Sequence, residues 1–362
     1  MSLLFHVVFA TACRGTHQRL ALDALRHLRG PDAERWTDLV LHHHRAYRAG
    51  AIAPDRQFKD FQNHVLHVGE ENWGGAIAAA RRWYGCTVEA LRRQSWSEAV
   101  YAAGVLSHYF SDPAMPLHTA QSEGEAAVHR AVEWSVSRSY GELQHILDLD
   151  LGGYPRIEPP RSGDWLAHLV AQHAELAHEH YQAILDHYDL AAGVKDPQAG
   201  MDQECKDRLA LCLGCAVVGF ARVLERAFAE SAVEPPPVEI TWHGFLAAAA
   251  APARWLIGGL HNVHERLLVE AIYDEVQRTG KVVHNLPEDD RTVRQLHAQE
   301  VLKVPLADLD AQPVQPTGTL FGTGKPARAN PNRLIAAPVI DNRSGPAGIL
   351  RRKRRLHMRD AA

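Results

Sequence analysis

Cysteine is scarce in this sequence, and the few residues present are scattered. Five cysteines make an odd number, with no second CxxC to complete a zinc ribbon and no spacing typical of a disulfide framework. They are Cys13, Cys86, Cys205, Cys212 and Cys215. The last two lie in the apolar run LALCLGCAVVGF, where small buried core residues are expected. Neither a disulfide scaffold nor a cysteine-based zinc ribbon is therefore predicted.

Long apolar stretches are also missing. No segment reaches the ~20 uninterrupted apolar residues that span a bilayer. The nearest, ITWHGFLAAAAAPARWLIGGLH, is interrupted by Pro252 and Arg254. The N-terminal segment MSLLFHVVFATACRG is short, has no basic region and carries a histidine inside its apolar run, so it is not typical of a cleaved leader. We therefore predict a cytoplasmic protein with no transmembrane segment.

Alternating, strand-like runs are almost absent. Apolar residues instead recur at spacings of three and four, which is the period of an amphipathic helix. The clearest segments are HQRLALDALRHLRG, SEAVYAAGVLSHYF, AAVHRAVEWSVSRSY, DWLAHLVAQHAELAHEHYQAILDHY and DRLALCLGCAVVGFARVLERAFAES. With 46% hydrophobic residues over 362 positions, the sequence can fill a substantial core. An all-α fold, a multi-helix bundle, is the prediction.

A proline run divides the chain. The segment AVEPPPVEI, residues 232–240, interrupts both helices and central strands, so residues 1–231 are predicted to form the main domain. Residues 241–305 follow as a small helical C-terminal segment, in which DDRTVRQLHAQEVLKVPL indicates a capped helix with Asp290 near its start. Residues 312–362 are rich in Pro, Gly, Thr and Asn and predict a disordered, low-complexity tail.

Charge also separates the tail from the rest of the chain. From Val314 onward ten Lys and Arg oppose two Asp and Glu, although the whole chain has a formal net charge of −4. Such a tail is attracted to anionic membrane surfaces or to nucleic acid, by ~1 kcal/mol for each basic residue close to a lipid surface. The sequence does not choose between these partners, and a tail that only aids solubility is the alternative.

Histidine is abundant, and its placement is the unusual signal. Of 23 histidines, eleven lie in the first 133 residues, interleaved with carboxylates. His108 and Asp112 stand four apart on a predicted helix that ends near the following proline, so both project from one face. After His118 in a turn, His129 and Glu133 repeat the same spacing. Imidazole and carboxylate groups in this pattern predict a metal site.

Further candidates lie upstream. Asp55 follows a proline and precedes His64 by nine residues, with His67 one helical turn beyond. His17 opens an amphipathic helix, and His6 lies in the apolar segment before it. An isolated helical histidine is more often a surface or hydrogen-bonded core residue than a ligand. Two pairs of histidine and carboxylate around one turn favour metal binding, because carboxylates on an apolar helix cost energy unless they are paired or metal-bound.

These residues resemble the zinc-dependent phospholipases C, over roughly residues 5–230. The matching motifs are PD, DFQNH, HYFSD, PLH and HRAVE. The resemblance implies a helical bundle of the zinc phospholipase C and nuclease type, with up to three zinc ions. The implied ligand sets are Asp55, His64, His108 and Asp112 for one ion, His118, His129 and Glu133 for a second, and Asp112 with His17 for a third. Mixed nitrogen and oxygen ligands with open positions suit catalytic zinc.

Two assignments remain open within this resemblance. Secreted members complete the third ion with the amino group and carbonyl of an N-terminal Trp, which this sequence does not have. We expect His6 to substitute, with a buried FHVV segment as the alternative. For the first ion we prefer His64 to His67, because DFQNH places an acidic and an aromatic residue shortly before the ligand, as in the family.

The expected function is phosphodiester hydrolysis. Clustered zinc lowers the pKa of bound water towards ~7, which supplies zinc-bound hydroxide at neutral pH, and it neutralises phosphate oxygens. The resemblance implies that Asp55 also has a catalytic role, in orienting or deprotonating that water. The predicted substrate is a phospholipid, cleaved on the glycerol side of its head group.

Two other functions are compatible with the same ligands. A single-strand-specific nuclease or nucleotidase shares the fold, but this chain has TAQSEGEAAVH where the nucleases have a GGN-type segment. A non-catalytic, zinc-stabilised binding protein that uses its basic tail is the second alternative. Residues 241–305 do not resemble the β-sandwich lipid-binding module of the toxins in the family, which weakens any inference of membrane attack.

Overall fold

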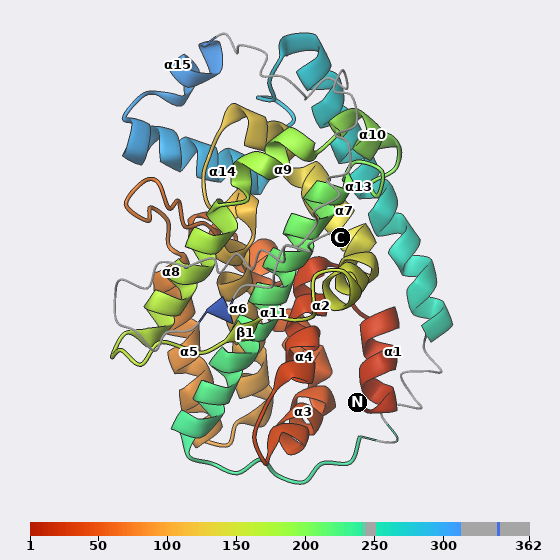
Figure 1. The fold of residues 1–362 in the computed structure, drawn as a ribbon, viewed down its shortest axis with the longest axis vertical. Helices are drawn as coiled ribbons and strands as arrows, with labels where there is room; N and C mark the ends of the chain where they lie inside the picture. The colour runs from red at the N-terminus through yellow and green to blue at the C-terminus, as the bar shows by residue number, and fades with distance from the viewer. Residues whose placement is uncertain (241, 243–250, 313–338, 341–362) are drawn as a thin grey trace, which may run out of the picture.

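A computed structural model gives the fold and describes residues 1–240, 242, 251–312 and 339–340. The described chain is almost entirely helical (Figure 1). Its longer helices are α5 (Ala76–Arg92), α6 (Trp96–Ser111), α7 (Glu123–Leu149), α8 (Trp165–His178), α11 (Gln203–Ser231) and α13 (Ala251–Thr279). Its shorter α-helices are α1 (Leu3–Thr11), α2 (Thr16–Ala24), α3 (Ala33–His42), α4 (His44–Gly50), α9 (Tyr181–His187), α10 (Leu190–Lys195), α14 (Glu288–His297) and α15 (Leu306–Ala311). The prediction of an all-α fold is confirmed.

Short turns of tighter or wider helix connect these elements. They are η1 (Leu25–His27), η2 (Pro54–Phe58), η3 (Phe61–His64), η4 (Asp112–Ala114), η5 (Pro116–His118) and η6 (Ala298–Leu302). The described strands are two residues each: β1 (Arg156–Ile157) pairs in parallel with β2 (Val339–Ile340), Arg156 opposite Val339. In the part of the chain that the structure describes, the helices are too short or too polar to cross a bilayer.

Local sequence signals fix where the site-bearing helices begin and end. At the start of α7, the Oγ of Ser122 accepts a hydrogen bond from the backbone N–H of Glu125 at 3.0 Å. Helix α6 ends at Ser111 and continues at Asp112 into the turn η4, because Pro113 has no backbone N–H to extend the hydrogen bonds of the helix. His108 and Asp112 therefore lie at the C-terminal end of α6, as the spacing predicted.

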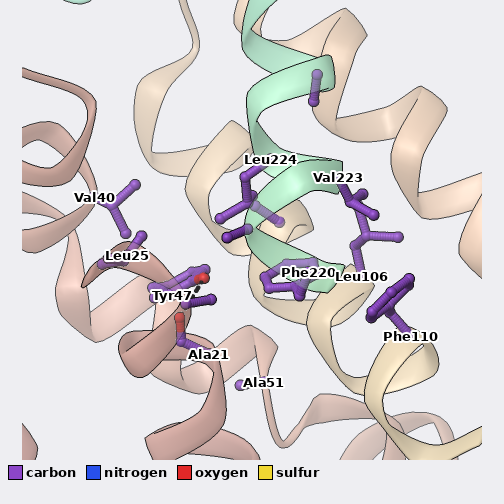
Figure 2. Close-up of a cluster of buried hydrophobic side chains, with 14 of the residues drawn as sticks. Ala21, Leu25, Val40, Tyr47, Ala51, Leu106, Phe110, Phe220, Val223 and Leu224 are labelled. Carbon is purple, nitrogen blue, oxygen red and sulfur yellow. Dashed lines mark hydrogen bonds between the residues drawn. The ribbon is translucent and has the colours of Figure 1, made fainter. Parts of the chain in front are cut away.

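Helix α11 lies at the centre of the main core. Its side chains Phe220, Val223 and Leu224 are buried between α6 on one side and the N-terminal helices on the other (Figure 2). Tyr47 of α4 reaches into the same cluster, and its hydroxyl donates a hydrogen bond to the carbonyl of Ala21 at 2.9 Å. The apolar faces that the sequence predicts for α2, α6 and α11 thus meet in this cluster, which holds α2 and α6 in place.

Two glycines bring α4 unusually close to α6. A Cβ on Gly50 would lie 2.2 Å from the carbonyl oxygen of Tyr101, and one on Gly104 would lie 2.2 Å from that of Tyr47. Only residues without a side chain fit at this crossing. The close contact fixes the position of α6, and with it the metal-ligating residues at its end.

The C-terminal segment packs on the main body. Val269, Ile272 and Val276 of α13 are buried in the same apolar cluster as Leu143 of α7. In Figure 1, α13 runs along one side of the molecule past α1, while α14 and α15 lie at one end. The predicted helical extension is therefore present and shares a core with residues 1–231. The predicted basic tail lies outside the described residues, apart from Gln312, Val339 and Ile340.

Candidate metal centre

The end of α6 presents the first two ligands. The Nε2 atom of His108 lies 3.1 Å from Oδ2 of Asp112, one helical turn further along. The other ring nitrogen, Nδ1, donates a hydrogen bond to the carbonyl of Ala51 at 2.9 Å. This bond fixes the tautomer, because a carbonyl oxygen only accepts, and it leaves Nε2 free of a proton when the ring is neutral. A neutral imidazole with a bare Nε2 is the form that binds a metal.

Asp55 and His64 complete the first predicted set. Asp55 Oδ1 lies 3.3 Å from Nε2 of His108, and His64 Nδ1 lies 3.0 Å from Oδ2 of Asp112. The three side chains of Asp55, His64 and His108 place ligand atoms within 4.8 Å of one another. The structure thus brings His64 to this set, whereas His67 faces a different group of residues.

The second predicted set also converges. His118 Nε2 and His129 Nε2 lie 3.7 Å and 3.6 Å from the same oxygen of Glu133. His118 comes from η5, and the other two come from one face of α7. These three side chains can bind one ion together.

Of the two histidines predicted for the third set, His17 lies at the centre and His6 does not. His17 Nδ1 lies 3.5 Å from Oδ1 of Asp112, and its ring stacks on that of His108 at 3.9 Å. His6 is not brought to the centre. It is exposed on α1, whose buried residues include Leu4 and Val8, so the helical period turns its side chain away from the core. In the described residues, the third group consists of His17, His108 and Asp112.

The environment of Asp112 fits a divalent cation. The residue is 1% exposed, yet among the described residues neither carboxylate oxygen accepts a hydrogen bond of proper geometry. An unsatisfied buried carboxylate is costly. Three imidazoles nevertheless lie 3.0–3.5 Å from it. Imidazoles that lie this close to a carboxylate without hydrogen-bonding to it are expected where metal ions bind between them. The mixed nitrogen and oxygen donors suit zinc.

The carboxylates of the centre are ionised. Burial opposes ionisation, but the neighbouring His108 outweighs it and lowers the pKa of Asp55 to about 2. For the same reasons the pKa of Asp112 is lowered well below its ordinary value. Burial also opposes ionisation of Glu133, but the neighbouring His118 and His129 outweigh it and lower its pKa. Negative oxygen ligands are thus available at neutral pH.

The pKa values of the imidazoles shift in different directions. Burial lowers the pKa of His17. Burial also acts on His108, but Asp112 and Asp55 outweigh it and raise the pKa well above the ordinary value. In the metal-free protein a proton on His108 therefore occupies the place of a cation.

A cavity of about 980 Å³ opens onto all three groups. Its wall carries the basic residues Arg14, Arg19, Arg45, Arg48, Arg56, Lys59, Arg130 and Arg138. The C-terminal segment adds the acidic residues Glu265, Glu288, Asp289 and Asp290, of which Glu265 pairs with Arg130 and Glu288 with Lys59. The cavity is large enough for a phosphoester with a sizeable substituent.

Several site residues were not foreseen from the sequence. Glu125 and Asp290 place carboxylate oxygens 2.7 Å and 2.9 Å from Nδ1 of His129, opposite the nitrogen that faces Glu133. Glu125 stands four residues before His129, so the helical spacing used for the ligands could have found it. Asp290 comes from α14 and has no local signal. It does not cap that helix, as its position near the start had suggested.

Comparison with known proteins identifies the family of this chain. A family model described as zinc-dependent phospholipase C matches residues 16–210, more than half of the 362 residues. The chain belongs to the zinc-dependent phospholipase C family. The matched range includes every predicted ligand except His6, so the resemblance read from the motifs is confirmed. A search of curated proteins finds no match.

Solved structures similar to this member of the family include two clostridial toxins. Alpha-toxin of Clostridium perfringens, from an avian strain, has 15% sequence identity, a TM-score of 0.46, and coverage of 60% of this chain and 64% of its own. Alpha toxin of Clostridium absonum has 14% identity, a TM-score of 0.45, and coverage of 61% of this chain and 66% of its own. The chain thus spans slightly less than two thirds of the length of each toxin.

Proposed function

We propose that this protein is a zinc-dependent phosphodiester hydrolase that cleaves phospholipids on the glycerol side of the head group. Two of the predicted ligand groups meet at Asp112, and the third lines the same cavity, which is the observation that supports the proposal most strongly. The family described above supports zinc and the phospholipase C class. We further propose that three ions bind, two of them sharing Asp112.

The ligand sets fit zinc, which when bound lowers the pKa of water and neutralises phosphate charge. Asp55 has a second task in this proposal. Its pKa of about 2 keeps the carboxylate ionised, so it can accept a hydrogen bond from the attacking water and orient it. The side chain is 41% exposed, so water and substrate can reach it.

Arg130 is placed to bind the phosphate. Its guanidinium lies in the cavity wall and donates hydrogen bonds to Glu133 at 3.0 Å and to Glu265 at 2.8 Å. These two carboxylates hold the side chain in one orientation beside the second ligand group. A fixed guanidinium at this place matches the planar, two-oxygen geometry of a phosphodiester.

The proposal is tested with zinc-loaded protein and a phosphatidylcholine analogue in micelles, by following release of diacylglycerol and the phosphorylated head group. Asp55→Asn is expected to lower turnover by roughly 10²-fold or more. Asp150→Asn, an exposed position at the end of α7, is the matched control and should keep full activity. Zinc per chain is measured for each protein. Full activity in Asp55→Asn would contradict the role of that carboxylate.

Single-stranded DNA is assayed in parallel, because nucleases share the ligand pattern. Cleavage of DNA with no cleavage of lipid would replace the phospholipase proposal by the nuclease alternative. Absence of both activities in protein that carries its zinc would favour the non-catalytic alternative.

A further inference from the structure

A second group of metal-binding side chains lies apart from the three predicted sets. His67, Glu70 and His297 place ligand atoms within 4.8 Å of one another. Nδ1 of His67 lies 2.9 Å from Oε2 of Glu70, and Nε2 of His297 lies 2.8 Å from both oxygens of the same carboxylate. Both histidines are buried, at 1% and 4% exposure, while Glu70 is partly exposed. The group thus meets solvent at Glu70, and His67 also lines the cavity of the metal centre.

A tightly hydrogen-bonded loop presents His67 and Glu70 on the same side. The backbone N–H of His67 donates to the carbonyl of Trp73 at 2.7 Å, and that of Trp73 donates to Glu70 at 2.9 Å. Glu71 and Asn72 take left-handed backbone conformations that close the turn, with φ of 53° and 59°. The two ligand side chains are thus held in position by backbone bonds, before any contact with α14.

The third member comes from the other end of the described chain. His297 is the last residue of α14, and its ring lies edge-on to that of His67, with centroids 5.2 Å apart. The indole of Trp73 packs against both rings, at 4.8 Å and 5.4 Å. An aromatic wall of this kind shields the imidazoles from water and leaves Glu70 as the exposed side of the group.

The donor set and its protonation suit a divalent transition metal. Two imidazoles and one carboxylate form a recurrent zinc-ligand set that keeps a fourth position open. Burial lowers the pKa of His67 to about 4, so its ring is neutral at pH 7. Burial opposes ionisation of Glu70, but hydrogen bonds from His297 and His67 outweigh it and lower its pKa. The nitrogen–oxygen separations of 2.8–2.9 Å are hydrogen-bond distances. Ligand atoms around a tetrahedral zinc ion lie about 3.3 Å apart, so the three side chains need to separate by only about 0.5 Å to admit the ion.

We propose that His67, Glu70 and His297 bind a zinc ion that is separate from the catalytic cluster and fastens α14 to the main body.

This site would act on the catalytic centre through the backbone on either side of it. The N–H groups of Leu66 and Val68 donate hydrogen bonds to the carbonyls of His118 and Thr119, each at 3.0 Å. His118 is a predicted ligand of the second catalytic group. At the opposite end of α14, Asp290 reaches His129 of the same group. A zinc ion bound by His297 would therefore fix the C-terminal end of α14, while the contact between Asp290 and His129 fixes its N-terminal end beside the catalytic ligands.

The test compares metal content in three full-length variants. His297→Ala and Glu70→Gln each remove one ligand, and His284→Ala removes an exposed histidine of the same segment as the matched control. After zinc loading and dialysis, wild type and His284→Ala are expected to retain one more zinc per chain than either ligand variant. Equal zinc content in all four proteins would overturn the proposal.

Two further measurements separate a metal site from a purely hydrogen-bonded contact. Chelator-treated protein is titrated with Co²⁺, whose visible absorption reports nitrogen and oxygen coordination, and the ligand variants should lose one equivalent of the signal. Thermal unfolding is then measured with and without zinc. If the variants lower Tm equally in both conditions, the three residues form only a hydrogen-bonded contact, and the proposal fails. Glutamine has nearly the same shape as glutamate, so Glu70→Gln is expected to fold. This variant therefore still tests the site if His297→Ala does not fold.

This outcome is independent of the proposed lipid hydrolysis. The ligand variants leave all the residues of the catalytic cluster in place, so loss of one zinc with turnover retained would support the site without bearing on the substrate. If the protein does not hydrolyse lipid, the measured difference in zinc per chain between wild type and the ligand variants still tests the site.

Discussion

Asp290 Oδ1 lies 2.9 Å from Nδ1 of His129, so the C-terminal segment directly contacts a ligand of the metal centre. Glu125 Oε1 lies 2.7 Å from the same nitrogen, while the opposite nitrogen faces Glu133. A histidine that ligates metal through one nitrogen commonly has a carboxylate at the other, which orients the ring and makes it a stronger ligand. Asp290 and Glu125 are placed to do this for His129.

Replacing Asp290 should therefore weaken zinc binding without removing a ligand. We expect Asp290→Asn to lower the affinity of the His118, His129 and Glu133 group by about 10- to 100-fold, the usual effect of losing such a partner. Affinity is measured by competition with a chromophoric chelator. Glu288→Gln, an exposed acidic residue two positions earlier in α14, is the matched control. Unchanged affinity in Asp290→Asn would show that Glu125 alone orients the ring.

Zinc should stabilise the protein more strongly as pH rises. Burial opposes protonation of His108 and His129, but their carboxylate neighbours outweigh it and raise both pKa values well above the ordinary one. In metal-free protein, the stability from these raised pKa values is fully present below the unfolded-state pKa of about 6.5 and is lost as pH rises through the folded-state values. Zinc needs the neutral rings and competes with these protons.

The expected result is a zinc-induced rise in Tm that is larger at pH 8 than at pH 6. It is measured by calorimetry on chelated and zinc-saturated samples in matched buffers. A rise that stays constant or shrinks across this range would mean that protons and metal do not compete at these histidines.

The crossing of α4 and α6 should tolerate no added side chain. Gly104→Ala would place a Cβ 2.2 Å from the carbonyl oxygen of Tyr47, so the two helices must move apart. We expect a loss of about 1–3 kcal/mol in the free energy of unfolding, the range typical of overpacked cores, together with reduced zinc content. Urea unfolding monitored by circular dichroism gives the first quantity.

Gly85 in α5 is the matched control for that substitution. No described atom lies within 4 Å of a Cβ built there, and the residue is exposed. Gly85→Ala should raise stability by about 0.5–1 kcal/mol, since alanine favours a helix interior over glycine. Similar losses from both substitutions would mean that the effect is not specific to the crossing.

Much of the fold and part of the site could be predicted from local spacing. His108 with Asp112, and His129 with Glu133, stand one helical turn apart, and a helix needs no tertiary information to place such residues on one face. The same rule applies to His6. The sequence led us to expect that it replaces the N-terminal Trp ligand of secreted members, but its position relative to Leu4 and Val8 turns its side chain outward in the structure.

The contribution of α14 could not be predicted in this way. Asp290 and His297 reach the body because α13 packs along α7 and because Val293 of α14 packs on Phe61 and Val65. No spacing within the sequence encodes these contacts. The proline run after α11 predicts a domain boundary, and that division stays a prediction. The packing of Val269 and Ile272 against α7 is a tertiary contact that such a signal does not encode.

The cysteines should differ sharply in reactivity. Cys86 is exposed, whereas the other four are buried, and burial raises the pKa of Cys13 and of Cys215 to about 12. Because the thiolate is the nucleophile, iodoacetamide at pH 8 should label native protein once, at Cys86, and label all five cysteines after unfolding. Mass spectrometry of the intact protein and its peptides gives the count. Rapid labelling of Cys212 in native protein would show that the core around α11 opens.

The order of the ligands along the chain bears on how the centre is assembled during synthesis. All the residues of the three predicted sets precede α8, while α14, which contacts His129 through Asp290, comes near the end of the described chain. A growing polypeptide thus carries its full set of imidazoles and carboxylates well before α14 is synthesised. Metal ions can bind the three sets during that interval, and the later arrival of Asp290 then adds its carboxylate beside His129.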